Sequence, residues 1–390
     1  MTPVGRPGSP SALRIQNRTR VIGALRTHGE MTQAALARQT GLAPATVSNI
    51  VRELAADGDV RVAAAGGRAR RVRLAAQTGN VIGVDYGHRH VTVAVSDHTH
   101  RILAERRAEL DTGITAEAGL TIAARLVDAA MAAAGIDRSA VVGAGMGLPA
   151  PIDAATGIVG SPSILPGWVG IRAGELATAA MDLPVRMRVD NDANLGALAE
   201  HRWGGGVGVA DMAYLKLSDG VGAGLIVGGT VYSGASGTAG EIGHTTIDEF
   251  GDVCRCGNRG CLETLVSARR VISLLKSTGE SPPRTISEVV RRADTGDRAC
   301  ARVLEDVGHQ VGRAVADLCS LLNPSLLLVG GELGQAAPLL IPAIRQVVLR
   351  CGVPSAAEQL DIRLGRLGAR THVYGAIALA IADADGQLTQ

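Results

Sequence analysis

The first eighty residues contain three segments whose apolar positions recur every three or four residues. Residues 17–29, 32–41 and 42–58 each show this spacing, which predicts a helix with one buried face. Thr32 stands where the second helix needs an N-cap, and Gly41 stands where that helix must end. Two short helices that meet at Gly41 predict a helix-turn-helix.

The periodicity then changes from helical to alternating. Residues 59–75 are typical of two strands around Gly66-Gly67, which predicts a β-hairpin wing. Arginines at and after this turn can pair with phosphates or enter a minor groove: Arg68, Arg70, Arg71 and Arg73. The other predicted DNA contacts lie on the polar side of the second helix of the pair: Ala45, Thr46, Ser48, Asn49 and Arg52.

The charge distribution favours this interpretation. Residues 1–75 contain twelve arginines and four acidic residues, a balance of +8, whereas the remainder holds 27 basic and 33 acidic residues, a balance of −6. A basic segment on an acidic body is typical of a separate nucleic-acid-binding module. The helix pair alone leaves open a small helical domain with a solvated charged loop. We expect a disordered tail over 1–16 and a winged helix-turn-helix domain over 17–76.

From residue 78 onward, apolar strands that end at Gly, Asp or Asn alternate with helices, which predicts an α/β architecture. A strand-strand-helix theme near residue 80 recurs near residue 212, which predicts two lobes with a cleft between them. We place this body at 79–385. The expected first lobe covers about 79–190 with a C-terminal helix at about 372–385, and the second covers about 191–371.

The composition narrows the setting of the protein. A hydrophobic content of 46% in 390 residues provides cores for more than one domain. The N-terminus has no apolar signal region, and no apolar run reaches the roughly 18 residues of a membrane span. We therefore expect a cytoplasmic protein without membrane contact.

The clustering of the cysteines in the sequence indicates a metal site. Three of the six cysteines, Cys254, Cys256 and Cys261, lie within eight residues, and His244 precedes the first of them by ten. One imidazole and three thiolates complete a tetrahedral Zn²⁺ site and leave no position for water, which predicts a structural zinc. The alternative is a surface loop with reduced cysteines.

Several motifs taken together resemble the ROK family (repressors, open reading frames and kinases). They are Glu241-Ile-Gly-His244, the run from Cys254 to Glu263, Asn191-Asp-Ala-Asn194, Leu165-Pro-Gly-Trp168, and Asn323-Pro324 with Gly330-Gly331. The resemblance implies an actin-like, two-lobed ATPase-type fold that assembles as dimers or tetramers. The winged head is typical of the family's transcription regulators, and the cysteine run matches the family's zinc motif.

The resemblance also implies a sugar site. Residues matching the family's sugar contacts are Asn191, Asp192, Glu241, His244 and Glu263. Asp192 matches the general base that kinases of the family use on a sugar hydroxyl, and residues 166–168 match a loop that closes over the sugar. Ile164 stands where kinases commonly carry Asn, which removes one hydroxyl partner. Taken singly, Asp192 or Glu263 is better explained as a helix cap or a surface acid, and only the joint pattern favours a sugar contact.

The two phosphate loops differ from those of the family's kinases. Residues 85–89 read Asp-Tyr-Gly-His-Arg where the kinases have Asp-x-Gly-Gly-Thr, and residues 218–222 read Ser-Asp-Gly-Val-Gly where they have Gly-Thr-Gly-x-Gly. A carboxylate about 4 Å from a phosphate charge costs about 4 kcal/mol at an effective dielectric constant of 20, so we do not expect ATP and Mg²⁺ to bind.

Two hypotheses follow. The favoured one is a sugar-responsive DNA-binding regulator of carbohydrate metabolism genes, most simply a repressor. Its partners would be pseudo-palindromic operator DNA and a small sugar or sugar phosphate effector. The alternative is an ATP-dependent, glucokinase-like sugar kinase with an appended DNA-binding head, in which Asp192 is the catalytic base.

Overall fold

The computed structural model describes residues 14, 17–18, 20–25, 29–64, 70–74, 79–161, 164–277 and 281–385. The chain divides into two compact units, Met1–Gly79 and Asn80–Gln390. No helix within the described ranges is both long enough and apolar enough to cross a membrane.

The smaller unit contains the predicted helix pair. Residues 20–25 are helical and precede α2 (Gln33–Thr40) and α3 (Pro44–Ala56). The Thr32 hydroxyl accepts a hydrogen bond from the Ala35 N–H at 3.2 Å, and Gly41 has a left-handed φ of 68°, so both predicted helix boundaries are confirmed. The apolar faces meet in one small core: Val21, Leu25, Leu36, Val47, Ile50, Val51, Leu54, Val60 and Val72.

The predicted hairpin is also present. Strand β2 (Val60–Ala64) pairs antiparallel with β3 (Arg70–Leu74), and β3 also pairs with the short strand β1 (Met31–Thr32), which the sequence pattern did not predict. The Gly66-Gly67 turn and Arg68 lie outside the described residues. Of the predicted tail the structure describes only Arg14, whose guanidinium lies 2.7 Å from the Glu53 carboxylate.

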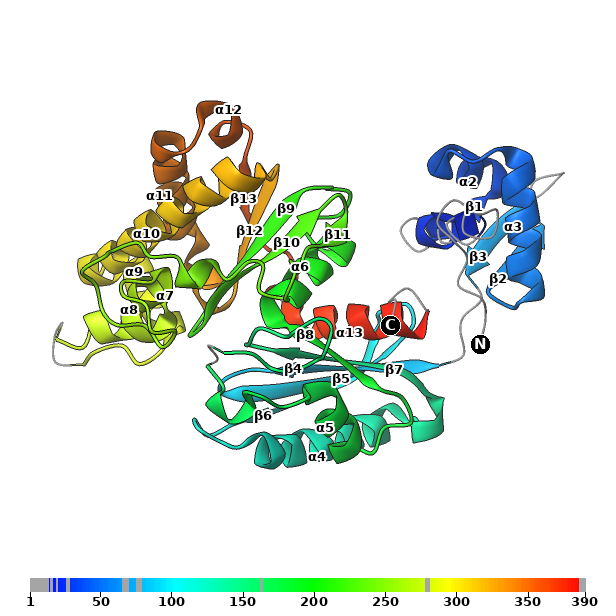
Figure 1. Ribbon diagram of the computed structural model, residues 1–390, viewed down its shortest axis with the longest axis horizontal. Helices are drawn as coiled ribbons and strands as arrows, with labels where there is room; N and C mark the ends of the chain where they lie inside the picture. The colour runs from blue at the N-terminus through cyan, green and yellow to red at the C-terminus, as the bar shows by residue number, and fades with distance from the viewer. Residues whose placement is uncertain are drawn as a thin grey trace. The chain divides into compact units, whose positions relative to one another are not determined.

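The larger unit contains two five-stranded sheets (Figure 1). The first has the order β6-β5-β4-β7-β8. Its strands are β4 (Asn80–Tyr86), β5 (His90–Asp97), β6 (Ile102–Glu109), β7 (Val141–Leu148) and β8 (Met187–Asn191). Helices α4 (Ala116–Ala134) and α5 (Ala173–Ala180) cover one face. The polar strand β6 was not predicted, because it lies at the sheet edge and none of its residues is fully buried.

The second sheet repeats this arrangement with the order β11-β10-β9-β12-β13. Its strands are β9 (Met212–Leu217), β10 (Val221–Val227), β11 (Thr230–Val231), β12 (Leu326–Gly330) and β13 (Asp361–Leu364). Its accompanying helices are α7 (Leu262–Val266), α8 (Ala268–Leu274), α9 (Ile286–Asp294), α10 (Arg298–Leu322), α11 (Ala337–Cys351) and α12 (Pro354–Ala357). In both sheets, the first strands in the chain pair antiparallel, and two later strands add to the sheet in parallel. The predicted duplication and the two-lobed α/β fold are therefore confirmed.

Helices α6 (Asp192–Trp203) and α13 (Thr371–Ala384) lie between the two sheets (Figure 1). Glycines allow the close packing: a Cβ on Gly145 of β7 would lie 2.2 Å from the Ala376 carbonyl oxygen of α13, and one on Gly224 of β10 would lie 2.2 Å from the Ala193 carbonyl oxygen of α6. The chain passes between the lobes just before each helix. The N-terminus of α6 is therefore placed at the cleft.

Short 3₁₀ helices complete the connections. They are η1 (Arg138–Ala140), η2 (Pro166–Trp168), η3 (Ile242–His244), η4 (Glu332–Ala336) and η5 (Gly368–Arg370). The fully buried Trp168 of η2 packs edge-on against Tyr86 at the end of β4, with ring centroids 4.9 Å apart. This contact joins the Leu165–Trp168 loop to the turn that follows β4.

Candidate functional site

A polar pocket lies between the lobes. One side is formed by Pro149, Ala150, Pro151 and Ile164 of the first lobe. The remaining wall includes every residue of the predicted sugar site: Asn191, Asp192, Glu241, His244 and Glu263. Lys216 and Arg255, which the sequence motifs did not identify, also line the pocket. The structure thus brings together residues that are up to 114 positions apart in the chain.

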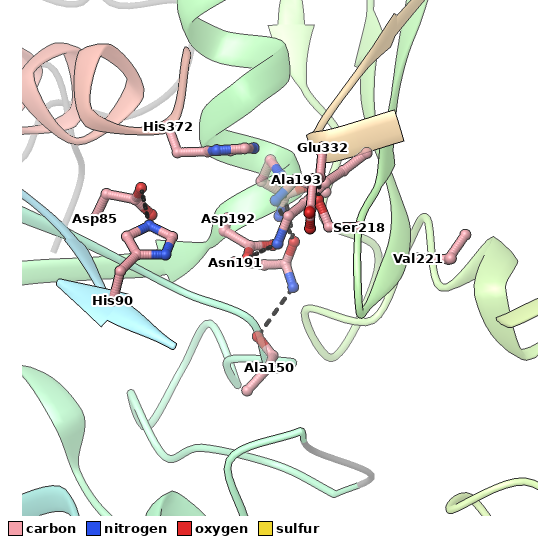
Figure 2. Close-up of polar contacts among 12 residues, drawn as sticks. Asp85, His90, Ala150, Asn191, Asp192, Ala193, Ser218, Val221, Glu332 and His372 are labelled. Carbon is pink, nitrogen blue, oxygen red and sulfur yellow. Dashed lines mark hydrogen bonds and ion pairs between the residues drawn. The ribbon is translucent and has the colours of Figure 1, made fainter. Parts of the chain in front are cut away.

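Asn191 connects the two lobes at the start of α6. Its Oδ1 accepts hydrogen bonds from the backbone N–H groups of Ala193, at 2.8 Å, and Asn194, so Asn191 is the N-cap of α6. Its Nδ2 donates to the Ala150 carbonyl oxygen at 3.1 Å (Figure 2). The amide is therefore held in place by protein contacts while the residue lines the pocket.

Asp192 and Lys216 form an ion pair in the pocket wall. The Lys216 ammonium donates to Asp192 Oδ2, and the two side chains are only 13% and 6% exposed. Lys216 lies on β9, where its register partners are Gly222 on β10 and Gly330 on β12. One signal did mark this residue, because Lys216 is one of only two lysines in an arginine-rich chain. The sequence pattern gave no indication of its partner.

Glu263 and Arg255 form a second ion pair on the other side of the pocket. Arg255 Nη2 lies 2.5 Å from Glu263 Oε1, and Glu263 Oε2 accepts a hydrogen bond from the Val221 N–H at 3.0 Å. Glu263 is buried, so it is not a surface acid. Its position in the first turn of α7 aims the carboxylate at the start of β10.

Glu241 precedes η3, and His244 is the last residue of this short helix. Burial, with smaller contributions from the charges of Asp192 and Glu263, raises the pKa of Glu241 to about 7. His244 Nε2 lies 3.8 Å from Glu241 Oε2, and its Nδ1 lies 3.5 Å from Cys254 Sγ. The imidazole ring therefore faces the pocket with one nitrogen and the cysteines with the other.

The predicted metal ligands converge. The donor atoms of His244, Cys254, Cys256 and Cys261 all lie within 4.8 Å of one another. Cys256 Sγ and Cys261 Sγ are 3.6 Å apart, close to the roughly 3.8 Å expected between sulfurs in tetrahedral coordination with Zn–S bonds of about 2.3 Å. These residues can hold a metal ion.

The loop that carries these cysteines depends on glycine. Gly260 has a left-handed φ of 64°, and a Cβ there would lie 1.5 Å from the Asp248 carbonyl oxygen. Cys254 is held by the hydrogen bond from its own N–H to the Asn258 carbonyl oxygen, at 2.7 Å. The tight backbone turn brings the cysteines together independently of pocket residues in the first lobe.

The two altered loops contact each other across the cleft. Arg89, in the turn between β4 and β5, lies 2.7 Å from Asp219 Oδ2 in the turn between β9 and β10, and His88 Nδ1 lies 3.4 Å from the same oxygen. Burial opposes ionisation of Asp219, but the His88 hydrogen bond and the charges of Arg89 and Arg269 outweigh it and lower the pKa of this carboxyl.

Asp85, the first residue of the first altered loop, is paired within its own lobe. Its Oδ2 lies 3.0 Å from His90 Nε2 (Figure 2). Burial would raise the pKa of Asp85, but the His90 hydrogen bond and the charges of His90, His372 and Lys216 lower it.

In the smaller unit, α3 separates an apolar face from a polar face as predicted. Val47, Ile50, Val51 and Leu54 are buried, whereas the candidate DNA contacts are exposed or half-buried: Ala45, Thr46, Ser48, Asn49 and Arg52. Arg70 and Arg71 on β3 are exposed, and Arg71 lies 3.4 Å from Glu30. The role of these side chains in DNA binding stays a prediction.

These features define a class of protein: a two-lobed, actin-like α/β body with a polar inter-lobe pocket, in one chain with a winged helix-turn-helix unit. The ROK family model matches residues 81–383, and a model described as a domain of unknown function (DUF7343) matches residues 14–75. The chain belongs to the ROK family.

Regulators of this family resemble the chain over almost its whole length. It is 28% identical to the putative xylose repressor of Caldicellulosiruptor sp. (strain Rt8B.4), covering 96% of this chain and 98% of that protein. It is 30% identical to the DNA-binding transcriptional dual regulator NagC of Escherichia coli K12, covering 93% and 94%. A crystal structure of a ROK family transcriptional regulator, a homologue of the E. coli MLC protein, superimposes with a TM-score of 0.81 at 26% identity over 96% of this chain and 97% of that one.

Proposed function

We propose that this protein is a sugar-responsive, DNA-binding transcriptional repressor of carbohydrate metabolism genes. The observation that carries the proposal is the Arg89–Asp219 ion pair, which places charged side chains against each other where a kinase would need open loops for phosphate. A winged helix-turn-helix unit and a polar pocket accompany it in the same chain. The full-length similarity to repressors supports the same function.

The pocket would bind the effector through its hydroxyl groups. We assign the contacts to Asn191, Asp192, Glu241, His244 and Glu263, which together line the cavity. Buried hydroxyls must find partners, because each one left unpaired costs about 1–3 kcal/mol. Side chains already fixed by backbone hydrogen bonds and ion pairs provide such partners with little loss of conformational entropy.

The cysteine cluster would hold a structural Zn²⁺ through His244, Cys254, Cys256 and Cys261. Four protein ligands leave no position for water, so the metal's contribution is to cross-link the loop. This role fits the geometry of His244, whose second ring nitrogen faces Glu241 in the pocket. Metal binding would thereby fix the orientation of a pocket side chain.

The smaller unit would bind operator DNA. Thr46 and Asn49 would contact bases, and Arg68, Arg70 and Arg71 would contact phosphates. We propose a homodimer or homotetramer, in which paired units read a pseudo-palindromic operator whose half-sites are separated by whole turns of about 10 bp.

Replacement of both Arg70 and Arg71 by Ala tests this assignment. The double variant should bind every DNA sequence more weakly than the parent protein does. The plot of log K against log salt concentration should become shallower, by about one unit of slope per lost phosphate contact. Arg106→Ala, on β6 of the larger unit, is the matched control. Operator binding that survives deletion of residues 1–75 would refute the proposal.

A sugar kinase is the second candidate, favoured by Asp192, which lines the pocket where a base is needed, and by the other retained sugar-site residues. The Lys216 ammonium on its carboxylate and the charged loops argue against it. A coupled assay of ATP consumption over a panel of hexoses and pentoses should give no turnover. Asp192→Asn should largely preserve the sugar-dependent change in operator affinity. Loss of that response together with a measurable phosphoryl-transfer rate in the parent protein would favour the kinase.

A further inference from the structure

The cations in the wall of the pocket are already paired with carboxylates. Lys216 contacts Asp192, and Arg255 contacts Glu263 at 2.5 Å. Glu241 adds a third carboxyl group to the same wall. The pocket therefore offers an incoming ligand no surplus of positive charge, although Lys216 and Arg255 are both cations.

The neighbouring turns show the same balance. Arg89 and His88 both contact Asp219, and His90 contacts Asp85. The charge of Arg269, which lines the cleft near His88, also acts on Asp219. Among the described residues, these four basic side chains therefore each lie near a carboxylate.

Glu332 adds a further acid in this region. The Glu332 N–H donates to Ser218 Oγ at 3.0 Å (Figure 2 shows these two residues beside each other). Burial, together with the charge of Asp219, raises the pKa of Glu332. The charges of Arg89 and His90 oppose this shift but do not outweigh the burial.

An anionic ligand would meet a specific obstacle here. A phosphate ester carries about −1.5 to −2 charges at pH 7, so it needs a free ammonium or guanidinium. To recruit Lys216 or Arg255, it would have to leave Asp192 or Glu263 as a buried carboxylate without its partner, which is strongly unfavourable. A neutral hydroxyl has no such requirement, since each pair keeps unused N–H donors and carboxylate lone pairs for it.

We propose that Lys216 and Arg255 are specificity-determining residues: their ion pairs with Asp192 and Glu263 select an uncharged sugar as effector and reject its phosphate esters and sugar acids. The inference rests on the sugar-sensing function proposed above and specifies the chemical class of the ligand. It also assigns a role to two side chains that the sequence motifs did not identify.

Matched ligands on the full-length protein test the selection. Isothermal titration calorimetry would compare glucose, xylose and N-acetylglucosamine with glucose 1-phosphate, glucose 6-phosphate, N-acetylglucosamine 6-phosphate and glucuronate. An uncharged sugar should bind, with its charged derivative at least about tenfold weaker. A phosphate or acid that binds more tightly than its parent sugar would overturn this inference and leave sugar sensing intact. Binding by no member of the panel would remove the sugar-sensing proposal, and this inference with it.

Two variants test the ion pairs themselves. Asp192→Asn leaves the Lys216 charge free and keeps the shape of the side chain, and Glu263→Gln does the same for Arg255. In each, the ratio of phosphate-ester Kd to parent-sugar Kd should fall by at least about tenfold, because a charge at contact distance acts on the phosphate. Asp383→Asn, which removes a carboxylate 2.7 Å from Arg188 outside the pocket lining, is the control and should leave the ratio unchanged.

Thermal unfolding and zinc content of each variant identify those that remain folded. If either Asp192→Asn or Glu263→Gln is unstable, the other variant still tests the role of the ion pairs. Folded Asp192→Asn and Glu263→Gln proteins with an unchanged ratio would show that these pairs do not set the selection.

Discussion

The two ends of the inter-lobe cleft use their polar side chains in different ways. At one end, Glu241 and His244 line a pocket, and the cysteine cluster and backbone hydrogen bonds hold its wall. At the other end, Arg89 and His88 contact Asp219 from the opposite lobe. The charged pairs of the first end line an open pocket, whereas those of the second end join the two lobes directly. The comparison teaches that the polar side chains of one cleft can line an open pocket at one end and contact one another across the lobes at the other.

The largest expected effect comes from removal of the metal at the pocket end. Cys256→Ser should reduce zinc from about one ion per chain to near zero and abolish the sugar response, because the loop loses its cross-link. The DNA-binding unit has its own core and should stay folded. Elemental analysis and operator titration with and without sugar measure both effects.

Cys351→Ser is the matched control, since Cys351 is an exposed free cysteine outside the cluster. It should retain zinc and the full response. A Cys256→Ser protein that lacks metal yet responds normally to sugar would show that the pocket does not depend on the cluster.

An intermediate effect is expected from one pocket carboxyl group. Glu241→Ala should weaken sugar binding by about 1–3 kcal/mol, since a buried hydroxyl loses its partner. Operator affinity without sugar should be unchanged, because Glu241 belongs to the larger unit. Calorimetry and operator titration measure the two quantities.

Glu249→Ala, an exposed acid on the same loop, is the control for Glu241→Ala and should behave as the parent protein. Equal sugar affinity in both variants would exclude Glu241 from the binding site. The pocket end of the cleft would then offer one polar side chain fewer to a ligand than we propose.

The smallest effect is expected at the opposite end. Arg89→Ala and Asp219→Ala, combined in a double-mutant cycle, should give a coupling energy of about 0.5–1 kcal/mol in thermal or denaturant unfolding, because Arg89 is half exposed and the solvent screens the pair. Added salt should reduce the coupling. A coupling energy near zero would mean that the two turns contact each other without stabilising the fold. The two ends of the cleft would then differ in the arrangement of their charges but not in their contribution to stability.

Local patterns were sufficient for much of the molecule. The Thr32 cap and the Gly41 stop of α2 depend on neighbours within one helix, so periodicity and capping rules predicted them. The convergence of the histidine and cysteines was predicted for a similar reason, since three of these four residues lie within eight positions and a tight glycine turn is enough to gather them. Strand β6 was missed because its polar, edge-exposed residues carry little alternation.

The ion pairs needed the folded chain. Lys216 and Asp192 are 24 positions apart, and His88 and Asp219 are 131 apart. No spacing rule links such residues, because sheet register and the packing of α6 against β9 and β10 decide which side chains meet. Even Arg255 and Glu263, eight positions apart, meet only because the cysteine loop turns back on itself.

The sequence by itself determined the kind of protein this is: a winged DNA-binding unit, a duplicated α/β body, and a set of carboxylates, histidine and cysteines suited to a ligand pocket and a metal. Residue type and short-range periodicity contain that information, because caps, turns and amphipathic faces depend on near neighbours. Only the tertiary structure decided which charges neutralise which. Electrostatic interaction depends on distance in space, and the three-dimensional packing of two lobes sets that distance.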